Sequence, residues 1–231
     1  MIPPLSIDFV WACGMGGDQP AVEAFLQNPA LDLAAGWGYG YTAIYRAAEK
    51  GRTNIVHQLM AEPRMCVADA PHLTIGNREN NVLRASAVNG HLDLVNLFLN
   101  DPRVSITPLE ANDVLRRVVR RGHSVVLERL LTDPRFDPCF EGSNMTRIAV
   151  DAKRLGALQV LLADPRVDPG DDDNVALMNA IYRGFTDVVA ALVADHRVDP
   201  SARENCGIAV ARERGHDDIV DILHNLDINP T

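Results

Sequence analysis

The stretch that decides the fold is residues 89–104, NGHLDLVNLFLNDPRV. Gly90 stands near its beginning, and apolar side chains follow at the fourth, fifth, eighth and ninth positions after this glycine. Because these offsets place side chains on one face of a helix, the spacing predicts a short amphipathic helix after Gly90. Asp101 and Pro102 then end the helix, since proline cannot continue a helix and restricts the residue before it.

The same arrangement recurs along the chain. The phrase D-P-R-V, or a variant of it, begins at positions 28, 62, 101, 133, 164 and 195, so that successive copies are 34, 39, 32, 31 and 31 residues apart. The fifth and eighth positions after the turn residue are apolar in all seven repeats, which indicates an internal repeat. A turn residue stands eleven positions before each copy, and the full series is Gly17, Gly51, Gly90, Gly122, Lys153, Gly184 and Gly215.

Each repeat is predicted to contain two helices, because a second helical segment precedes the turn, as at 82–89, 114–121 and 175–183. Glycine at the turn provides a left-handed backbone conformation without steric cost. One repeat cannot bury its apolar face alone, so the repeats must stack, and each stacked side chain contributes roughly 1.5–3 kcal/mol. We therefore expect an all-α solenoid of about seven repeats, a single domain over 1–231 with units near 1–33, 34–67, 68–106, 107–138, 139–169, 170–200 and 201–231.

Two stretches carry a resemblance to a known family. Residues 40–51, GYTAIYRAAEKG, resemble the ankyrin phrase G-x-T-P-L-H-x-A-A-x-x-G, and residues 89–99 resemble the ankyrin second helix, N-G-H-x-x-V-V-x-x-L-L. The chain is similar to ankyrin repeat proteins over essentially its whole length. It departs from them in the connector, where D-P-R-V-D-P replaces G-A-D-x-N, and at Lys153, which replaces a turn glycine. These departures concern the finger between repeats and leave the stacked helices as expected.

The resemblance implies a non-catalytic scaffold that binds another protein in a concave groove. In this family the groove is formed by the fingers and the exposed side of the first helices, and the two residues before the turn usually face it. Several arginines occupy such positions here, which predicts a locally basic groove for an acidic partner segment. The alternative is an ordinary solvated helix face. The groove candidates are Glu49, Lys50, Arg117, Arg120, Arg121, Tyr182, Arg183 and Arg214.

Other segments offer further candidates. Trp37, Tyr39 and Tyr41 form an aromatic finger, residues 36–41, whose side chains are either interface anchors or packed on the first repeat. The long connector 68–80 is either a binding loop or tolerated surface slack. An arginine recurs at one offset in successive connectors, and this repetition favours a structural Arg–Asp network over a phosphate-binding strip. These arginines are Arg64, Arg103, Arg135, Arg166 and Arg197.

Composition excludes several classes of function. The chain has 231 residues and a formal net charge of −9, which argues against nucleic-acid binding. It has no apolar run long enough to span a membrane and no signal peptide pattern, and its scattered cysteines are typical of reduced thiols. We therefore expect a cytoplasmic protein, in its own cell or in a host cell, that is monomeric on its own.

No catalytic or cofactor motif is visible in the sequence. His91, His123 and His216 belong to different repeats and lack partners at metal-ligand spacing, so we expect neither a metal nor a cofactor. The chain also lacks a nucleophile elbow, a phosphate loop and a zinc protease motif. Two alternatives to the interaction module stay open: an enzyme or enzyme subunit whose site is not visible in the sequence, and a binder of an anionic ligand through the arginine cluster.

Overall fold

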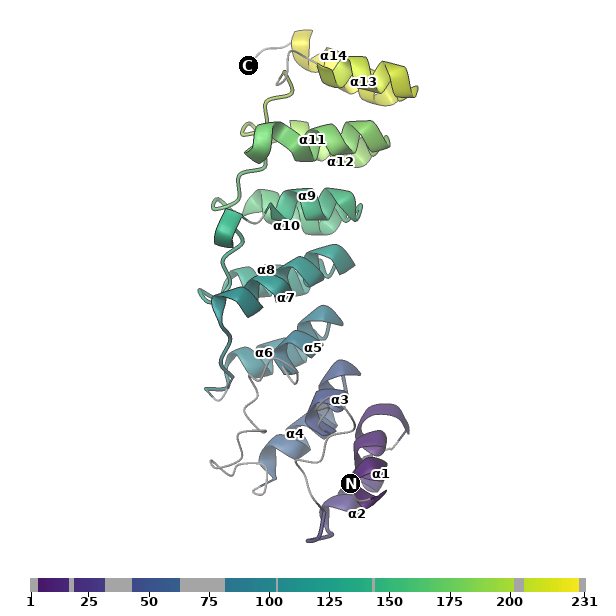
Figure 1. Cartoon of the computed structure of the whole chain (residues 1–231), viewed down its shortest axis with the longest axis vertical. Helices are drawn as coiled ribbons and strands as arrows, with labels where there is room; N and C mark the ends of the chain where they lie inside the picture. The colour runs from purple at the N-terminus through teal and green to yellow at the C-terminus, as the bar shows by residue number, and fades with distance from the viewer. Residues whose placement is uncertain are drawn as a thin grey trace. The chain divides into compact units, whose positions relative to one another are not determined.

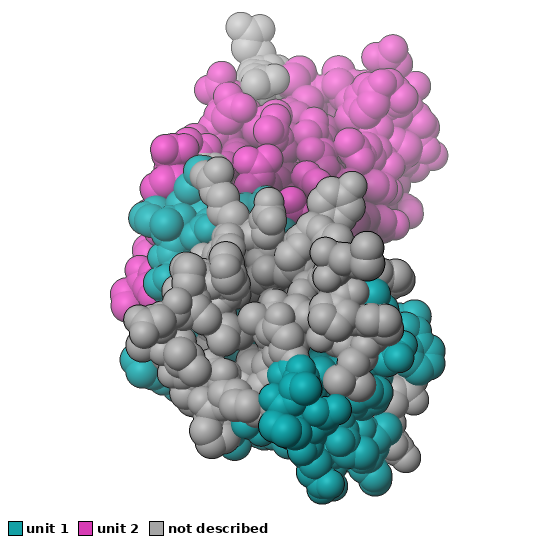
Figure 2. All heavy atoms as spheres, turned by 60° about the horizontal axis from the view of Figure 1, so that its bottom comes forward, with its two compact units in different colours: residues 1–114 teal, residues 115–231 magenta. Residues whose placement is uncertain are grey.

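A computed structural model describes residues 4–16, 19–31, 43–62, 82–102, 104–142, 144–201 and 206–228 of the chain. Within these ranges all regular structure is helical, which confirms the all-α prediction. The contacts group the chain into two compact units, residues 1–114 and 115–231, which Figure 2 shows in different colours. In the described part of the chain, no helix is both long and apolar enough to cross a membrane.

The first unit, residues 1–114, consists of helix pairs joined by tight turns (Figure 1). Helix α3 packs against its own partner α4, and also against η1 and α5 of the neighbouring pairs. The elements are α1 (Pro4–Trp11), the π-helix η1 (Ala12–Gly16), α2 (Gln19–Leu26), α3 (Ala43–Glu49), α4 (Thr53–Ala61), α5 (Val82–Val88), α6 (Leu92–Leu99) and the beginning of α7 (Pro108–Arg121).

The second unit, residues 115–231, is built in the same way. The first helices α9, α11 and α13 pack side by side, and so do the second helices α8, α10, α12 and α14 (Figure 1). This is the stacking that the repeat predicts. After the end of α7, the elements are α8 (Ser124–Leu131), the 3-10 turn η3 (Phe140–Gly142), α9 (Met145–Asp151), α10 (Leu155–Ala163), α11 (Asp171–Arg183), α12 (Thr186–Val193), α13 (Cys206–Arg214) and α14 (Asp217–Ile228).

The turn residues from Gly51 onward adopt the predicted left-handed conformation, and Gly17 lies outside the described residues. Glycine occupies this conformation at Gly51, Gly90, Gly122, Gly184 and Gly215, with φ between 68° and 81°. Lys153 takes the same conformation with a φ of 52°, although a side chain makes it unfavourable. The repeat therefore keeps its backbone geometry where it loses its glycine. The ammonium group of this lysine lies 4.9 Å from the ring centroid of Phe185 in the next repeat, which is a cation–π contact.

The apolar positions after each turn form the core, as predicted. In α6, which follows Gly90, all four predicted side chains are buried: Leu94, Val95, Phe98 and Leu99. The corresponding position eight residues after the turn is also fully buried in α8, α10 and α12. The stacked second helices thus bury an apolar column in each repeat, and this burial is the main stabilising contribution to the stack.

Helix α7 begins six residues earlier than the predicted segment 114–121, at Pro108. Its start is a capping box: the backbone N–H of Thr107 donates to the Glu110 carboxylate at 2.9 Å, and the N–H of Glu110 donates to the Thr107 hydroxyl at 3.3 Å. Proline at the first helical position is favourable because its missing N–H would have no helical partner. The phrase Thr107-Pro108-Leu109-Glu110 was the signal for this longer helix.

The connectors of the second unit are held by an Arg–Asp network, which confirms the structural interpretation of this motif. Arg197 donates from Nε and Nη2 to the two carboxylate oxygens of Asp195, at 2.8 and 2.6 Å. The same guanidinium donates to the carbonyl oxygens of Leu162 and Val167 in the preceding repeat, at 2.5 and 2.7 Å. One arginine therefore ties its own connector to the end of the previous second helix and to the connector after it.

Arg135 and Arg166 pair in the same bidentate way with the aspartates two positions before them. Arg166 also reaches back to carbonyl oxygens of the preceding repeat. Because protein acceptors occupy these guanidinium groups, the geometry supports a structural role rather than a phosphate-binding strip. Arg64 and Arg103 lie outside the described residues.

Candidate functional site

The predicted groove residues lie where the first helices end. Glu49 ends α3 and Lys50 follows it, the three arginines of the cluster lie on the last turns of α7, and the remaining candidates end α11 and α13. We call the surface they form in residues 115–231, with Asp151 and Asn179, the first-helix face. Apart from Asn179, which is half-buried, all of its residues are exposed: Arg117, Arg120, Arg121, Asp151, Tyr182, Arg183 and Arg214. The finger residues Trp37, Tyr39 and Tyr41 and the connector 68–80 lie outside the described residues.

Arg183 is paired with an acidic residue of the preceding repeat. Its Nη2 lies 3.1 Å from the Asp151 carboxylate, and its Nη1 donates to the Asp151 carbonyl oxygen at 3.0 Å. Asn179 donates to the same carboxylate at 3.3 Å. The sequence pattern predicts that Arg183 contributes a positive charge to the groove. Its pairing with Asp151 reduces the charge that the side chain presents to a partner.

Tyr182 and Arg214 form a second contact across repeats on the first-helix face. The Arg214 guanidinium lies 3.5 Å from the centroid of the Tyr182 ring, which is a close cation–π arrangement. The tyrosine side chain is nonetheless 53% exposed, so the stacked pair presents a flat, partly apolar surface to solvent. An exposed aromatic with a cation beside it combines the two residue types that dominate binding energy in protein interfaces.

In two repeats the residue after the turn fixes the end of the preceding first helix. His91 places Nε2 3.0 Å from the Glu49 carbonyl oxygen, and Arg154 donates from Nε to the Arg120 carbonyl oxygen at 3.0 Å. The His91 ring also covers Gly51, where a Cβ would lie 2.6 Å from ring atoms. These two side chains thus hold the helix end of the previous repeat, and His91 has a structural role.

The first unit contains two exposed apolar residues near the predicted groove positions, of which the sequence pattern places only Met15 in the groove-facing pair. Trp11 at the end of α1 is 55% exposed, and Met15 in η1 is 62% exposed. Met15 lies two positions before the turn residue and Trp11 lies one helical turn earlier, which are the positions of the groove candidates in the other repeats. A tryptophan in this column was the signal that could have identified them.

The thiols of Cys13 and Cys139 show no sign of activation. Burial raises the pKa of the Cys13 thiol to about 12. Partial burial, followed by the charges of Asp137 and Asp164, also raises the pKa of Cys139, whose thiol donates to the Arg166 carbonyl oxygen at 2.9 Å. Both groups are protonated at neutral pH and are therefore poor nucleophiles. Among the described residues there is no group of histidine, cysteine and carboxylate side chains that could hold a metal ion.

Comparisons with known proteins support the architecture. No model of a protein family matches the chain, and no curated protein does. Among solved structures, it is similar to the ankyrin repeat domain of Bcl-3, a unique member of the IkappaB protein family, with a TM-score of 0.65 and 21% sequence identity. The match covers 96% of this chain and 98% of that chain. At this level of identity the likeness concerns the fold, and it confirms the ankyrin-type helix-turn-helix solenoid that the repeat predicts.

Proposed function

Because the chain has the ankyrin repeat fold, we propose that it is a non-catalytic protein-interaction module whose partner binds along the first-helix face. One observation carries this proposal. The turns, connectors and helices repeat along the chain, whereas the exposed side chains at the ends of the first helices differ from repeat to repeat. The residue two positions before the turn is Asp151, Tyr182 and Glu213 in successive repeats, whereas the turns and connectors around them repeat closely. Repeat proteins present their binding surfaces in this way, because stacking constrains the frame and leaves the exposed positions variable.

The charge of the first-helix face supports an acidic partner segment. Arg117, Arg120 and Arg121 lie within the last two turns of α7 and are exposed, on a chain whose net charge is −9. Carboxylate groups of a partner can form charge-assisted hydrogen bonds with these guanidinium groups. The Tyr182–Arg214 pair, on later helices of the same face, adds a flat surface for an apolar or aromatic side chain.

The proposal includes a monomer as the acting form and an intracellular location. The net charge of −9 makes two copies repel each other at neutral pH, which supports a monomer. Cys13, Cys139 and Cys206 are free thiols, which supports a reducing compartment. Sedimentation of the purified chain and imaging of a tagged chain in its natural cell test these two parts.

A pull-down from a lysate of the natural cell tests the binding face. The bait is the wild-type chain, and beside it stands a triple variant in which Arg120, Arg121 and Arg183 are each changed to Glu. Circular dichroism verifies that the variant keeps its helical content. We expect a partner that the wild type captures and the triple variant loses, because the exchange reverses the charge of the face.

A matched pair of single variants locates the effect. Arg183→Glu and Arg212→Glu change the same charge in the last turn of a first helix, but Arg212 points to the second-helix side, where its Nη2 lies 2.6 Å from His224 Nε2. We expect Arg183→Glu to weaken partner binding and Arg212→Glu to leave it near the wild-type level. Equal binding by the wild type and the triple variant would contradict the proposed face.

A further inference from the structure

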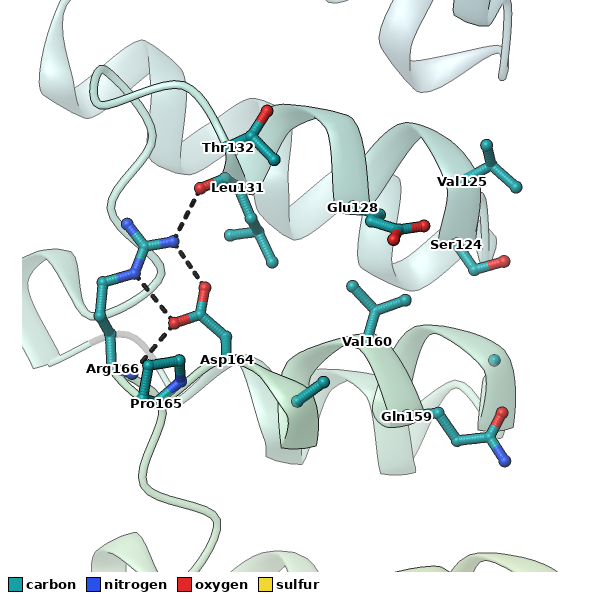
Figure 3. Close-up of a pocket in the computed structure, with 12 residues that line it drawn as sticks. Ser124, Val125, Glu128, Leu131, Thr132, Gln159, Val160, Asp164, Pro165 and Arg166 are labelled. Carbon is teal, nitrogen blue, oxygen red and sulfur yellow. Dashed lines mark hydrogen bonds and ion pairs between the residues drawn. The ribbon is translucent and has the colours of Figure 1, made fainter.

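The second helices of residues 115–231 enclose a hollow that the first-helix face does not use. A groove of about 730 Å³ lies between α8 and α10, and the connector at Asp164–Arg166 closes one end of it. Figure 3 shows Val125 and Glu128 along α8, opposite Gln159 and Val160 on α10. The volume falls in the range of sites that bind drug-sized molecules or the side chains of a peptide, roughly 300–1,000 Å³.

The groove is open because α10 has a glycine where the other helices carry a side chain. Gly156 is the third residue after the turn, and the equivalent residues in the neighbouring repeats are Val125 and Asp187. A Cβ at Gly156 would meet only the Ser124 side chain, at 3.5 Å from Oγ, which is an ordinary contact. Neither a tight turn nor close packing requires this glycine, so its effect on the structure is to leave the groove unfilled.

Apolar side chains line part of the groove beside polar ones such as Ser124 and Gln159, and α10 adds no charge to it. Residues 155–163, LGALQVLLA, contain no ionisable side chain. Val125 is 59% exposed and Val160 is half-buried, so both present methyl groups to the hollow. Exposed aliphatic groups around a hollow favour an apolar occupant, because binding removes their surface from water.

The charges at the rim select the occupant further. Asp164 and Arg166 neutralise each other through a bidentate pair. Glu128 is exposed and makes no hydrogen bond or ion pair with any residue that the structure describes. The groove therefore offers one negative charge beside an apolar hollow. The net charge of −9 on each copy disfavours a second copy of the chain as the occupant.

We propose that the groove between α8 and α10 binds a segment of another protein that combines an aliphatic or aromatic anchor with a neighbouring lysine or arginine. The anchor fills the space above Gly156 between Val125 and Val160, and the basic side chain pairs with Glu128. This site lies on the second helices, so it is separate from the first-helix face and allows the module to hold two segments at once.

Selection from a phage-displayed library of random dodecapeptides tests this assignment. The library is selected on the wild-type chain and depleted on Gly156→Leu, a variant whose side chain fills the groove from a helical position with room for it. We expect enriched sequences that pair a Leu, Ile, Phe or Trp with a Lys or Arg. A synthetic peptide of the leading sequence should bind the wild type in fluorescence anisotropy, and Gly156→Leu should weaken it about tenfold or more.

Variants that change a charge at the groove test the assignment without relying on Gly156→Leu. Glu128→Lys changes an exposed side chain and should weaken the peptide at least severalfold, with a loss that shrinks in high salt. Asp218→Lys, at an exposed position of α14 away from the groove, is the control with the same change in charge. The triple arginine variant of the first-helix face should bind the peptide normally, which separates this site from the proposed function.

Three results would overturn the assignment. The first is a selection that yields no peptide able to distinguish the wild type from Gly156→Leu. The second is a leading peptide that is acidic or lacks an apolar anchor. The third is a concentration-dependent dimer in analytical ultracentrifugation that Gly156→Leu abolishes, because that result would make a second copy the occupant.

Discussion

The connector edge and the first-helix face of residues 115–231 are both lined with arginines, but the arginines differ in how they are used. On the connector edge, Arg135, Arg166 and Arg197 repeat one arrangement, each bound to the aspartate two positions before it. On the first-helix face, Arg183 pairs with an acid of the preceding repeat and Arg214 stacks on a tyrosine, so these two contacts differ from each other. A contact that repeats with the frame holds the stack together, whereas an exposed contact that does not repeat is available for recognition.

The comparison predicts its largest effect at Arg197. Changing Arg197→Ala should lower the free energy of unfolding by about 2 kcal/mol, because Asp195 loses its partner and the carbonyl oxygens of Leu162 and Val167 lose a charged donor. Urea denaturation followed by circular dichroism measures this loss. Arg214→Ala is the matched control on the first-helix face, where an exposed cation–π contact contributes only about 0.5–1 kcal/mol. Equal losses for the two variants would erase the distinction between the two surfaces.

Acid should weaken the connector edge before it affects the apolar core. Hydrogen bonds from the arginines hold the pKa values of Asp133, Asp164 and Asp195 below the ordinary range. Because the folded-state pKa is lower than the unfolded value of about 3.9, this stabilisation is present above that pH and is lost as the pH falls further. The urea midpoint should therefore drop as the buffer is acidified through about pH 4.

A triple variant isolates this acid dependence. Changing the three aspartates to Asn removes the charges that titrate and keeps side chains of similar size. We expect the variant to be less stable than the wild type at neutral pH and to lose less stability on acidification. A variant whose urea midpoint falls as steeply with acid as that of the wild type would show that other groups cause the acid dependence.

Much of this frame could be predicted from the sequence, because it depends on local spacing. The turn glycines, the buried column after each turn and the arginines of the connectors recur at fixed offsets, so stacking and turn chemistry determine them. The pairing of Arg183 with Asp151 could not be read in this way. This contact joins side chains of neighbouring repeats, which lie 28 to 32 positions apart in the sequence. No local sequence pattern links residues that far apart.

The groove between α8 and α10 was invisible to the sequence argument for a different reason. The groove is open where Gly156 lacks a side chain. Apolar periodicity identifies positions by the side chains they carry, so it does not detect a position without one. The residues of α10 follow the same apolar spacing as the other second helices, so this spacing did not single the helix out. Trp11 was missed because the groove candidates were the two residues before each turn, extended one helical turn earlier only at Arg117.

The turn at Lys153 offers a smaller test, because it is the position where the repeated frame itself varies. Lys153→Gly should relieve a left-handed conformation that costs about 1–2 kcal/mol, but it removes the cation–π contact with Phe185. Combining Lys153→Gly with Phe185→His restores the residue pair found at Gly51 and His91. We expect this double variant to be more stable than the sum of the single changes by about 0.5–1 kcal/mol in a double-mutant cycle. Strict additivity would mean that the two substitutions do not compensate each other.

The smallest expected change in the free energy of unfolding is on the first-helix face. This position also gives the most direct test of the difference between the two surfaces. Arg183→Gln removes the ion pair with Asp151, whose two side chains are 43% and 41% exposed, so the free energy of unfolding should change by less than about 1 kcal/mol. Urea denaturation at low and high salt measures the change, which salt should reduce further because it screens exposed charges. A loss as large as that of Arg197→Ala would assign Arg183 to the frame of the stack. A loss near zero, together with weaker partner binding, would mean that Arg183 exchanges its ion pair with Asp151 for a contact with the partner.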